Sequence, residues 1–278
     1  MRNCTAYSAF RSSLPTKLWA SICYGILFLQ FGAVQSVRAE GQVKLMRTPD
    51  NGIQPQAIVD SQGTFHLIYF KGDPGAGDIF YARRAPGKKT FSDPIQVNSN
   101  PGSAIAVGTI RGGQIALGKG GRVHVAWNGS GRVKENSGMF CARSNDEGTA
   151  FEPQRNLMKG TEILDGGGTV AADGQGNVYV AWHALKKGSS PGEDNRRMWV
   201  ARSVDEGKTF ADEAPAWLEP TGACGCCSSH AFADSKGSIY VLYRSANQGV
   251  NRDMYLLSSK DTGKNFQGSL IHKWKIPG

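Results

Sequence analysis

The sequence has no long stretch with the apolar periodicity of a helix, and no apolar run outside its N-terminal region approaches the length of a membrane span. It also lacks a basic run or an alternation of basic and aromatic residues, which argues against a nucleic-acid partner. Glycine, in contrast, is abundant, with 36 residues in a chain of 278. These features favour a turn-rich, all-β protein built as one domain.

The first 39 residues are organised like an export signal. Basic residues precede an apolar run from Leu18 to Val34, and small residues precede the boundary after Ala39. The pattern predicts a signal peptide over residues 1–39 and a mature protein that is secreted or periplasmic, without stable membrane insertion after cleavage. An uncleaved N-terminal anchor is the alternative. Cleavage lowers the formal charge from +9 to about +5, a mildly basic balance that can favour an anionic ligand.

A short motif returns four times along the chain at nearly even spacing. It ends in aromatic residues that lie 60, 59 and 56 residues apart, at Phe91, Phe151, Phe210 and Phe266. The fullest copy, residues 203–210, reads SVDEGKTF, and the copy ending at Phe91 keeps only the tail of the pattern. A fixed period of this length indicates one structural unit that is repeated.

Each repeat divides in the same way, into a glycine-containing turn followed by alternating apolar segments. The first segments cover residues 65–70, 123–127, 178–182 and 239–243, and the second cover residues 79–83, 139–143, 198–202 and 254–258. Period-two alternation between turns predicts β-strands. With a strand before each glycine turn and another starting at each motif phenylalanine, every repeat has four strands, which is the composition of a propeller blade.

The motif aspartates have a structural task in this scheme. A short carboxylate in a turn can accept hydrogen bonds from nearby backbone amides, and the motif glycine permits a positive φ. We therefore predict that Asp146, Asp205 and Asp261 hold the turns between third and fourth strands and that none of them is catalytic.

The motif resembles the Asp-box of the sialidase superfamily, and the resemblance covers residues 40–278. It implies a sialidase-like β-propeller of four-stranded antiparallel blades, with about four blades present of a probable six. A chain truncated at its C-terminus is the preferred interpretation, and a closed four-bladed ring is the alternative. Asp-box propellers also serve other functions, so the resemblance speaks more to fold than to activity.

Sialidases bind a sugar carboxylate with three arginines and use a tyrosine assisted by glutamate, with an aspartate as acid/base. The resemblance places Ile53 where the first arginine is expected, which is a departure from the family pattern. It offers Asp73 and Asp78 as acid/base candidates and matches Arg244 to the second arginine. Cys226 and its neighbours occupy the place of the glutamate.

Two further candidates come from position alone. The innermost strands of a propeller line its central channel, so Gln54 and Arg111, near the starts of such strands, are expected to face a ligand. The segment that includes Arg111 is rich in glycine, which close backbone approach or, as the alternative, a simple turn explains. For Arg244 the alternative is an exposed arginine at a strand end.

A cysteine cluster is the remaining feature, formed by Cys224, Cys226 and Cys227. In an exported protein a disulfide bracing the inner strand, with one thiol left over, is the default. A strained disulfide between near neighbours and a soft-metal site for Cu(I) or Zn that includes His230 are the alternatives. No cofactor is expected, and no metal is assigned.

Three functions therefore stay open at this stage. The chain is interpreted as an exported sialidase-like propeller with a glycan or glycoconjugate as partner, either an exo-acting glycoside hydrolase releasing sialic acid or a related sugar, or a non-catalytic propeller that binds glycan or protein. The third alternative is a redox or metal role centred on the cysteine cluster.

Overall fold

The computed structural model describes residue 43 and residues 45–108 and 112–275. Contacts divide the chain into two units, residues 1–46 and 47–278, and the strands found among the described residues belong to the second. The proposed signal segment, residues 1–39, and Arg111 lie outside the described residues. No helix in the described part of the chain combines the length and apolarity that crossing a membrane requires.

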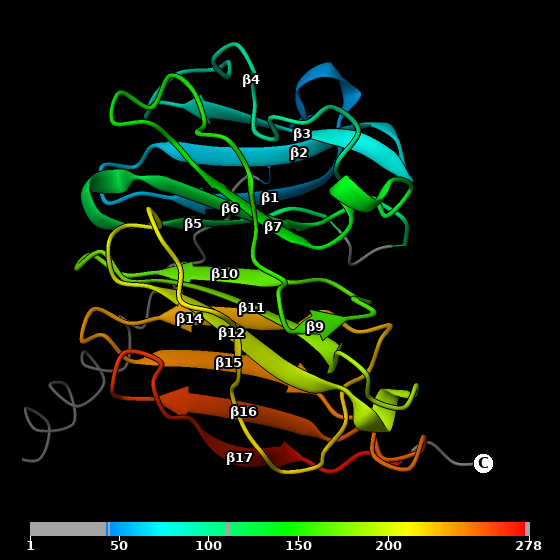
Figure 1. Cartoon of the computed structure of the whole chain (residues 1–278). Helices are drawn as coiled ribbons and strands as arrows, with labels where there is room; N and C mark the ends of the chain where they lie inside the picture. The colour runs from blue at the N-terminus through cyan, green and yellow to red at the C-terminus, as the bar shows by residue number, and fades with distance from the viewer. Residues whose placement is uncertain (1–42, 44, 109–111, 276–278) are drawn as a thin grey trace, which may run out of the picture. The chain divides into compact units, whose positions relative to one another are not determined.

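Four antiparallel sheets follow one another along the chain, coloured from blue-cyan through green and yellow to red in Figure 1. Blade 1 contains β1 (Ile53–Val59), β2 (Phe65–Asp73), β3 (Ala76–Arg84) and β4 (Ile95–Gln96). Blade 2 contains β5 (Gln114–Leu117), β6 (Val123–Asn128), β7 (Met139–Arg143) and β8 (Arg155–Asn156). Blade 3 contains β10 (Thr169–Ala172), β11 (Val178–Lys186), β12 (Arg197–Ser203) and β13 (Ala214–Pro215), with β9 (Thr161–Glu162) paired to β11. Blade 4 contains β14 (His230–Ala233), β15 (Ile239–Arg244), β16 (Met254–Ser259) and β17 (Gln267–His272).

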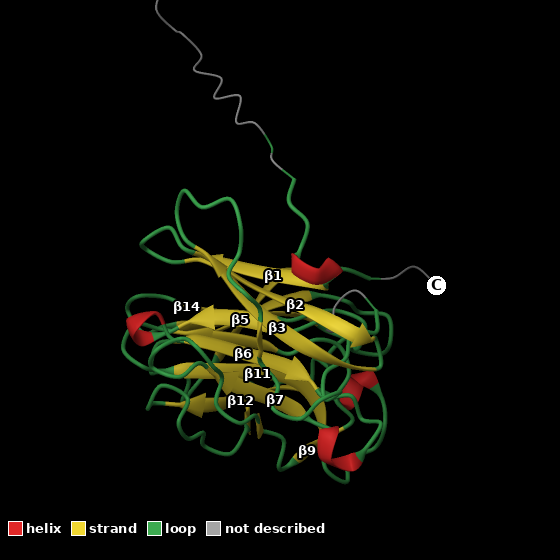
Figure 2. Cartoon of the chain, turned by 90° about the horizontal axis from the view of Figure 1, so that it is seen from above, coloured by secondary structure: helices red, strands yellow, loops and turns green. Residues whose placement is uncertain are grey.

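Helical structure in the described residues is confined to short 3-10 turns outside the sheets, drawn red in Figure 2. These turns are η1 (Pro49–Asn51), η2 (Lys119–Gly121), η3 (Lys134–Asn136) and η4 (Glu193–Asn195). Within each blade the strands pair in sequence order as an antiparallel meander. The predicted all-β fold of four-stranded blades is confirmed.

The innermost strands β1, β5, β10 and β14 neighbour one another in that order. Together they line a channel of about 350 Å³, whose walls include Gln56, Gln114, Ala171 and His230. A set of sheets whose first strands share one channel is a β-propeller. The described part of the chain therefore forms four propeller blades.

The hydrophobic core lies between successive blades. One cluster joins blades 1 and 2 through residues such as Phe70 and Trp127, a second joins blades 2 and 3 through Met139 and Trp182, and a third joins blades 3 and 4 through residues including Leu257. Alternation along each strand produces this arrangement, because one face of a strand points to the preceding blade and the other to the next.

The fourth strands begin later than the motif suggests. We predicted that they start at the motif phenylalanines. β4, β8 and β13 each begin four residues after the aromatic residue, whereas β17 begins one residue after Phe266. The phenylalanine rings are held by packing instead of strand pairing: Phe151 lies edge-on to Tyr81 at 5.6 Å between centroids, and Phe91 lies likewise against Phe65 at 6.0 Å. These rings close the turns before the short strands form.

One end of the propeller, here the turn face, carries the tight turns between first and second strands and the motif turns. Asp205 accepts the Ser203 hydroxyl at 2.7 Å and the Thr209 N–H at 3.0 Å. Asp261 likewise accepts the Ser259 hydroxyl at 2.7 Å and the Asn265 N–H at 3.0 Å. At these two positions the carboxylate spans the turn in the way the motif predicts.

Blade 2 uses a different residue for the same purpose. The side chain of Asp146 is 82% exposed and pairs with Arg122, whereas the Asn145 side-chain oxygen accepts the Thr149 N–H at 2.8 Å. The reason lies in Ser144, whose hydroxyl accepts the Val123 N–H at 3.1 Å instead of bridging the turn. The structure thus gives Asn145 the task that the sequence assigned to Asp146.

Candidate functional site on the loop face

The opposite end of the propeller, here the loop face, carries the hairpins between second and third strands and the segments that lead into each inner strand. Three such segments meet around the cysteine cluster. They are residues 163–168 before β10, residues 187–196 between β11 and β12, and residues 220–229 before β14. The chemistry of the loop face is concentrated there.

The three clustered cysteines turn their sulfur atoms toward one another. Cys224 Sγ lies 3.2 Å from Cys226 Sγ and 3.2 Å from Cys227 Sγ, and the last two are 3.9 Å apart. Cys224 is buried, Cys227 is half-buried and Cys226 is exposed. None of the described cysteines forms a disulfide, so the default prediction of a disulfide brace does not match the structure. The fourth described cysteine, Cys141, is buried between blades 2 and 3.

Glu193 lies in the blade 3 hairpin, residues 187–196. It connects this hairpin to the cysteine loop, residues 220–229. Its carboxylate accepts the Gly225 N–H at 2.5 Å and pairs with Arg252 Nη1 at 2.7 Å. Burial acts to raise the pKa of Glu193, but the Gly225 N–H and Arg252 outweigh it and hold this pKa below its ordinary value. The group is therefore ionised at neutral pH.

Arg196 lies beside Glu193 with little exposed side chain. Its Nη2 is 3.4 Å from Asp165 Oδ2 and its Nη1 is 3.7 Å from Glu193 Oε1, while its Nε and Nη1 have no hydrogen-bond partner among the described residues. A Cβ added to Gly225 would lie 2.2 Å from Arg196 Nη1 and 2.5 Å from Asp165 Oδ2. The backbone of the cysteine loop at Gly225 thus packs closely against the ends of these two side chains.

Arg244 lies at the cysteine cluster. Its guanidinium group stacks on the Trp274 ring at 4.5 Å from the centroid, and its Nε donates to the Arg252 carbonyl at 3.2 Å. Its Nη1 is 3.5 Å from Cys227 Sγ. The residue that the resemblance matches to a carboxylate-binding arginine thus lies against sulfur in this fold.

His183, on β11, is buried under the cysteine loop, beside Gly166 and the backbone of Cys227. Burial, reinforced by the nearby Arg196, lowers the pKa of His183 to about 4. The imidazole is therefore neutral at neutral pH and adds no charge to the site.

A groove of about 720 Å³ begins at Arg196 and runs between the blade 3 hairpin and residues 215–220. Its basic lining consists of Lys186, Arg196 and Arg197, set against one acidic side chain, Asp194. The apolar lining consists of Trp199, Pro215, Leu218 and Pro220. The groove combines a positive charge surplus with apolar side chains.

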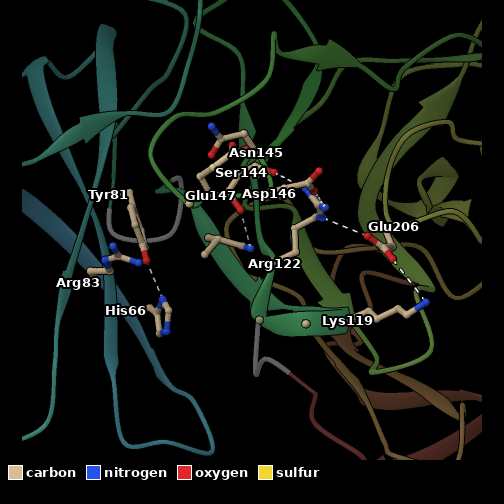
Figure 3. A pocket seen from close by; sticks show the side chains of 14 residues that line it. His66, Tyr81, Arg83, Lys119, Arg122, Ser144, Asn145, Asp146, Glu147 and Glu206 are labelled. Atoms are coloured by element: carbon tan, nitrogen blue, oxygen red, sulfur yellow. Dashed lines mark hydrogen bonds and ion pairs between the residues drawn. The ribbon is translucent and has the colours of Figure 1, made fainter.

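A second hollow, of about 360 Å³, lies on the turn face between blades 1 and 2 (Figure 3). Its charged side chains largely pair with one another: Arg122 bonds to Asp146 and, at 3.2 Å, to Glu206, which also lies 3.8 Å from Lys119. His66 meets the Tyr81 hydroxyl at 2.7 Å. The contacts of Arg122 and Lys119 with Glu206 join blades 2 and 3, whereas the other two pairs lie within one blade. We assign the hollow a structural role.

The two acid/base candidates in blade 1 are engaged in local contacts. Asp73 is exposed, accepts the Gly75 N–H at 2.7 Å and pairs with Arg132 at 2.8 Å, and these contacts lower its pKa. Asp78 accepts the Asn98 side-chain amide at 2.6 Å and the Gly102 N–H at 2.8 Å. Neither contacts the cysteine loop through any bond described here.

The side chain of Gln54 is hydrogen-bonded to backbone carbonyl groups of another segment. Gln54 adopts a positive φ of 48°, and its side-chain amide donates to the carbonyl oxygens of Ala106 and Gly108 at 3.0 and 2.5 Å. These bonds tie the start of β1 to the segment that leads into β5. The ligand-facing role of Gln54 stays a prediction, and the structure adds this contact between the two segments.

Sequence reasoning found the cysteines and Arg244 but missed Glu193, Arg196 and Asp165. The charge-rich segment at residues 193–197 is the one signal that could have pointed to the first two. Their partners lie in loops of other blades, which the sequence alone does not pair.

No protein-family model and no curated protein matches the sequence. Solved structures do match. A protein of unknown function from Dyadobacter fermentans is 18% identical with a TM-score of 0.54, over 79% of this chain and 68% of that one. An α-L-arabinofuranosidase from Fusarium graminearum, in complex with an iminosugar inhibitor, is 13% identical with a TM-score of 0.54, over 82% and 70%.

A sialidase from Trypanosoma rangeli, also bound to an inhibitor, is 12% identical with a TM-score of 0.53. The match covers 78% of this chain but 37% of the sialidase. At such identities the likeness shows the fold alone. The chain is thus similar in fold to propellers that include glycoside hydrolases.

Proposed function

We propose that the chain is an exported, glycan-recognising propeller that binds an acidic saccharide in the groove beside Arg196. The observation that carries the proposal is the groove itself, which offers three basic side chains and a run of apolar surface on the loop face. Saccharide rings lie against flat apolar surface, and carboxylate or sulfate groups pair with guanidinium and ammonium groups.

The size and charge of the groove suit this ligand. A volume of about 720 Å³ falls within the range of ~300–1,000 Å³ that is typical of small-molecule sites. Lys186 and Arg197 also line the groove, so an incoming oxyanion would pair with their charged groups. The similarity to an arabinofuranosidase and a sialidase supports a saccharide as the ligand class.

Hydrolysis of a sialoside has less support than binding. A general acid needs a raised pKa, whereas the contacts of Asp73 lower its pKa, and Asp78 is committed to Asn98 and Gly102. Ile53 also stands where the resemblance requires an arginine. Recognition is the function that the loop-face geometry favours.

The proposal is tested by calorimetric titration of the full chain with sialylated, uronate-bearing, sulfated and neutral oligosaccharides. Acidic saccharides should bind, and affinity should fall as salt is raised because the ion pairs are solvent-accessible. Lys186→Ala, which removes an exposed cation from the groove, should weaken binding about fivefold to tenfold.

Lys119→Ala is the matched control, because Lys119 is an exposed cation on the turn face. Its saccharide affinity should equal that of the unaltered protein. Absence of binding to every acidic saccharide, equal binding of neutral ones, or equal losses in the two lysine variants would contradict the proposal.

A further inference from the structure

The three cysteine sulfurs form a compact triangle with sides of 3.2, 3.2 and 3.9 Å. A triangle of these sides has a circumradius of about 2.0 Å, so a point about 1.1 Å above its plane lies about 2.3 Å from each sulfur, which is the zinc–sulfur bond length. One ion could therefore contact all three sulfurs with little movement of the loop.

The three sulfur atoms are arranged so that no two of them form a distinct pair. A disulfide needs two sulfurs at about 2.05 Å, and Cys224 Sγ lies at the same 3.2 Å from both of its neighbours. No third sulfur would be drawn into such a bond. An ion that accepts three donors accounts for the position of every sulfur in the cluster.

The donor set selects the kind of ion. Among the described residues, the group able to hold a metal consists of these three thiols alone, without a carboxylate or imidazole in reach of all of them. His230, which the sequence suggested as a ligand, is not in this group. Sulfur-only donors favour Cu(I) and Zn(II) over hard ions such as Mg²⁺ and Ca²⁺.

The surroundings offset the charge that binding would create. Three thiols release three protons to solvent when they ligate a metal, which leaves three thiolates around the ion. Arg244 Nη1 lies 3.5 Å from Cys227 Sγ, and Arg252 interacts electrostatically with Cys224 and Cys226. The exposed Cys226 leaves a route from solvent to the cluster.

We propose that Cys224, Cys226 and Cys227 bind one d10 metal ion, Cu(I) or Zn(II), as thiolates. Arg244 and Arg252 act as positioning residues that balance the charge of the thiolates. The site adjoins the saccharide groove through Glu193 and Arg196, but it does not depend on saccharide binding.

The test titrates reduced, chelator-stripped full chain with Zn(II) and, anaerobically, with Cu(I), each in competition with a chromophoric chelator. One equivalent of at least one ion should bind, with proton release and thiolate-to-metal charge-transfer absorption for Cu(I). Cys226→Ser should weaken binding by more than about 100-fold, because loss of an outer partner alone costs up to that factor. The relative affinities of the two ions identify which one the site prefers.

Cys141→Ala is the matched control, since Cys141 lies in the core between blades 2 and 3 and should leave binding of the metal unchanged. Lys186→Ala should also retain the metal, which separates this result from the saccharide experiment. Failure of both ions to bind stoichiometrically, or equal metal affinity in Cys226→Ser and the unaltered protein, would overturn the proposal. Circular dichroism of each variant confirms that it is folded.

Discussion

At the scale of single residues, each motif turn is held by a side-chain oxygen that accepts a hydrogen bond from a backbone N–H of the turn. Asp205 and Asn145 occupy different places in the motif, yet each presents a side-chain oxygen to the N–H four residues later. The sequence made Asp205 and Asp261 predictable because a short carboxylate before glycine has one common use in a turn. It could not reveal that Ser144 is diverted to the Val123 N–H, since that contact crosses to another strand.

Substitution at the two motif aspartates should therefore have unequal effects. We expect Asp205→Ala to lower the free energy of unfolding by about 1–2 kcal/mol, because turn donors lose their acceptor. Asp146→Ala should change it by less than about 0.5 kcal/mol, since this side chain is exposed. Urea denaturation of both variants measures the difference, and equal losses would show that Asp146 also holds its turn.

The loss of fold stability in acid should come from carboxylates whose pKa values are low in the folded state. The Arg143 hydrogen bond holds the pKa of Glu152 at about 2. At Asp205, burial acts to raise the pKa, but the hydrogen bonds from Thr209 and Ser203 outweigh it and hold the pKa of Asp205 at about 2. Both groups stabilise the fold fully above their unfolded pKa values near 4, and this contribution is lost as pH falls toward 2.

The free energy of unfolding should accordingly decline between about pH 5 and pH 2, as followed by denaturation at a series of pH values. Glu152→Gln should flatten the decline. A slope that is the same in Glu152→Gln and the unaltered protein would show that the Arg143 pair does not supply it.

At the scale of elements, alternation along a strand decides which residues are buried. Sequence reasoning predicted the second and third strands of each repeat because their apolar residues alternate over five or six positions; β6, for example, exceeds its predicted range by one residue. The fourth strands of blades 1 to 3 were misplaced because β4, β8 and β13 are two residues long and carry no periodic signal. Their pairing depends on the third strand beside them.

Blade 4 permits a direct test of this alternation. Leu257, which is opposite Val241 in the strand pair, is fully buried against blade 3, whereas Leu242, which is opposite Leu256, is 37% exposed. Leu257→Ala should cost about 2–5 kcal/mol, because it removes buried methyl groups and leaves a cavity. Leu242→Ala should cost clearly less, and a thermal or chemical denaturation series compares the two. A reversed order would mean that the two faces of β15 and β16 are exchanged.

At the scale of the whole molecule, the loop face and the turn face are separated by the length of the strands. β12 runs from Arg197 to Ser203, about 20 Å at the usual strand rise, with Arg196 before it and Asp205 after it. The repeat made this layout predictable, but not the identity of the site, because ion pairs between loops of different blades leave no periodic trace in a sequence.

Changes at the two ends should consequently be independent. The loss of unfolding free energy in an Arg196→Ala, Asp205→Ala double variant should equal the sum of the single losses within about 0.5 kcal/mol. A double-mutant cycle by urea denaturation measures the deviation from additivity. Coupling well above that value would indicate that the strands of blade 3 transmit strain from one face to the other.

The absence of a side chain at Gly225 allows the cysteine loop to pack closely against Arg196 of the blade 3 hairpin. A methyl group there would require the ends of the Arg196 and Asp165 side chains to shift. A change beside the sulfur atoms would then reach the saccharide groove through the displaced guanidinium group. Under the proposed function, ligand selectivity in blade 3 would thus depend on a residue that contributes no side-chain atom to either site.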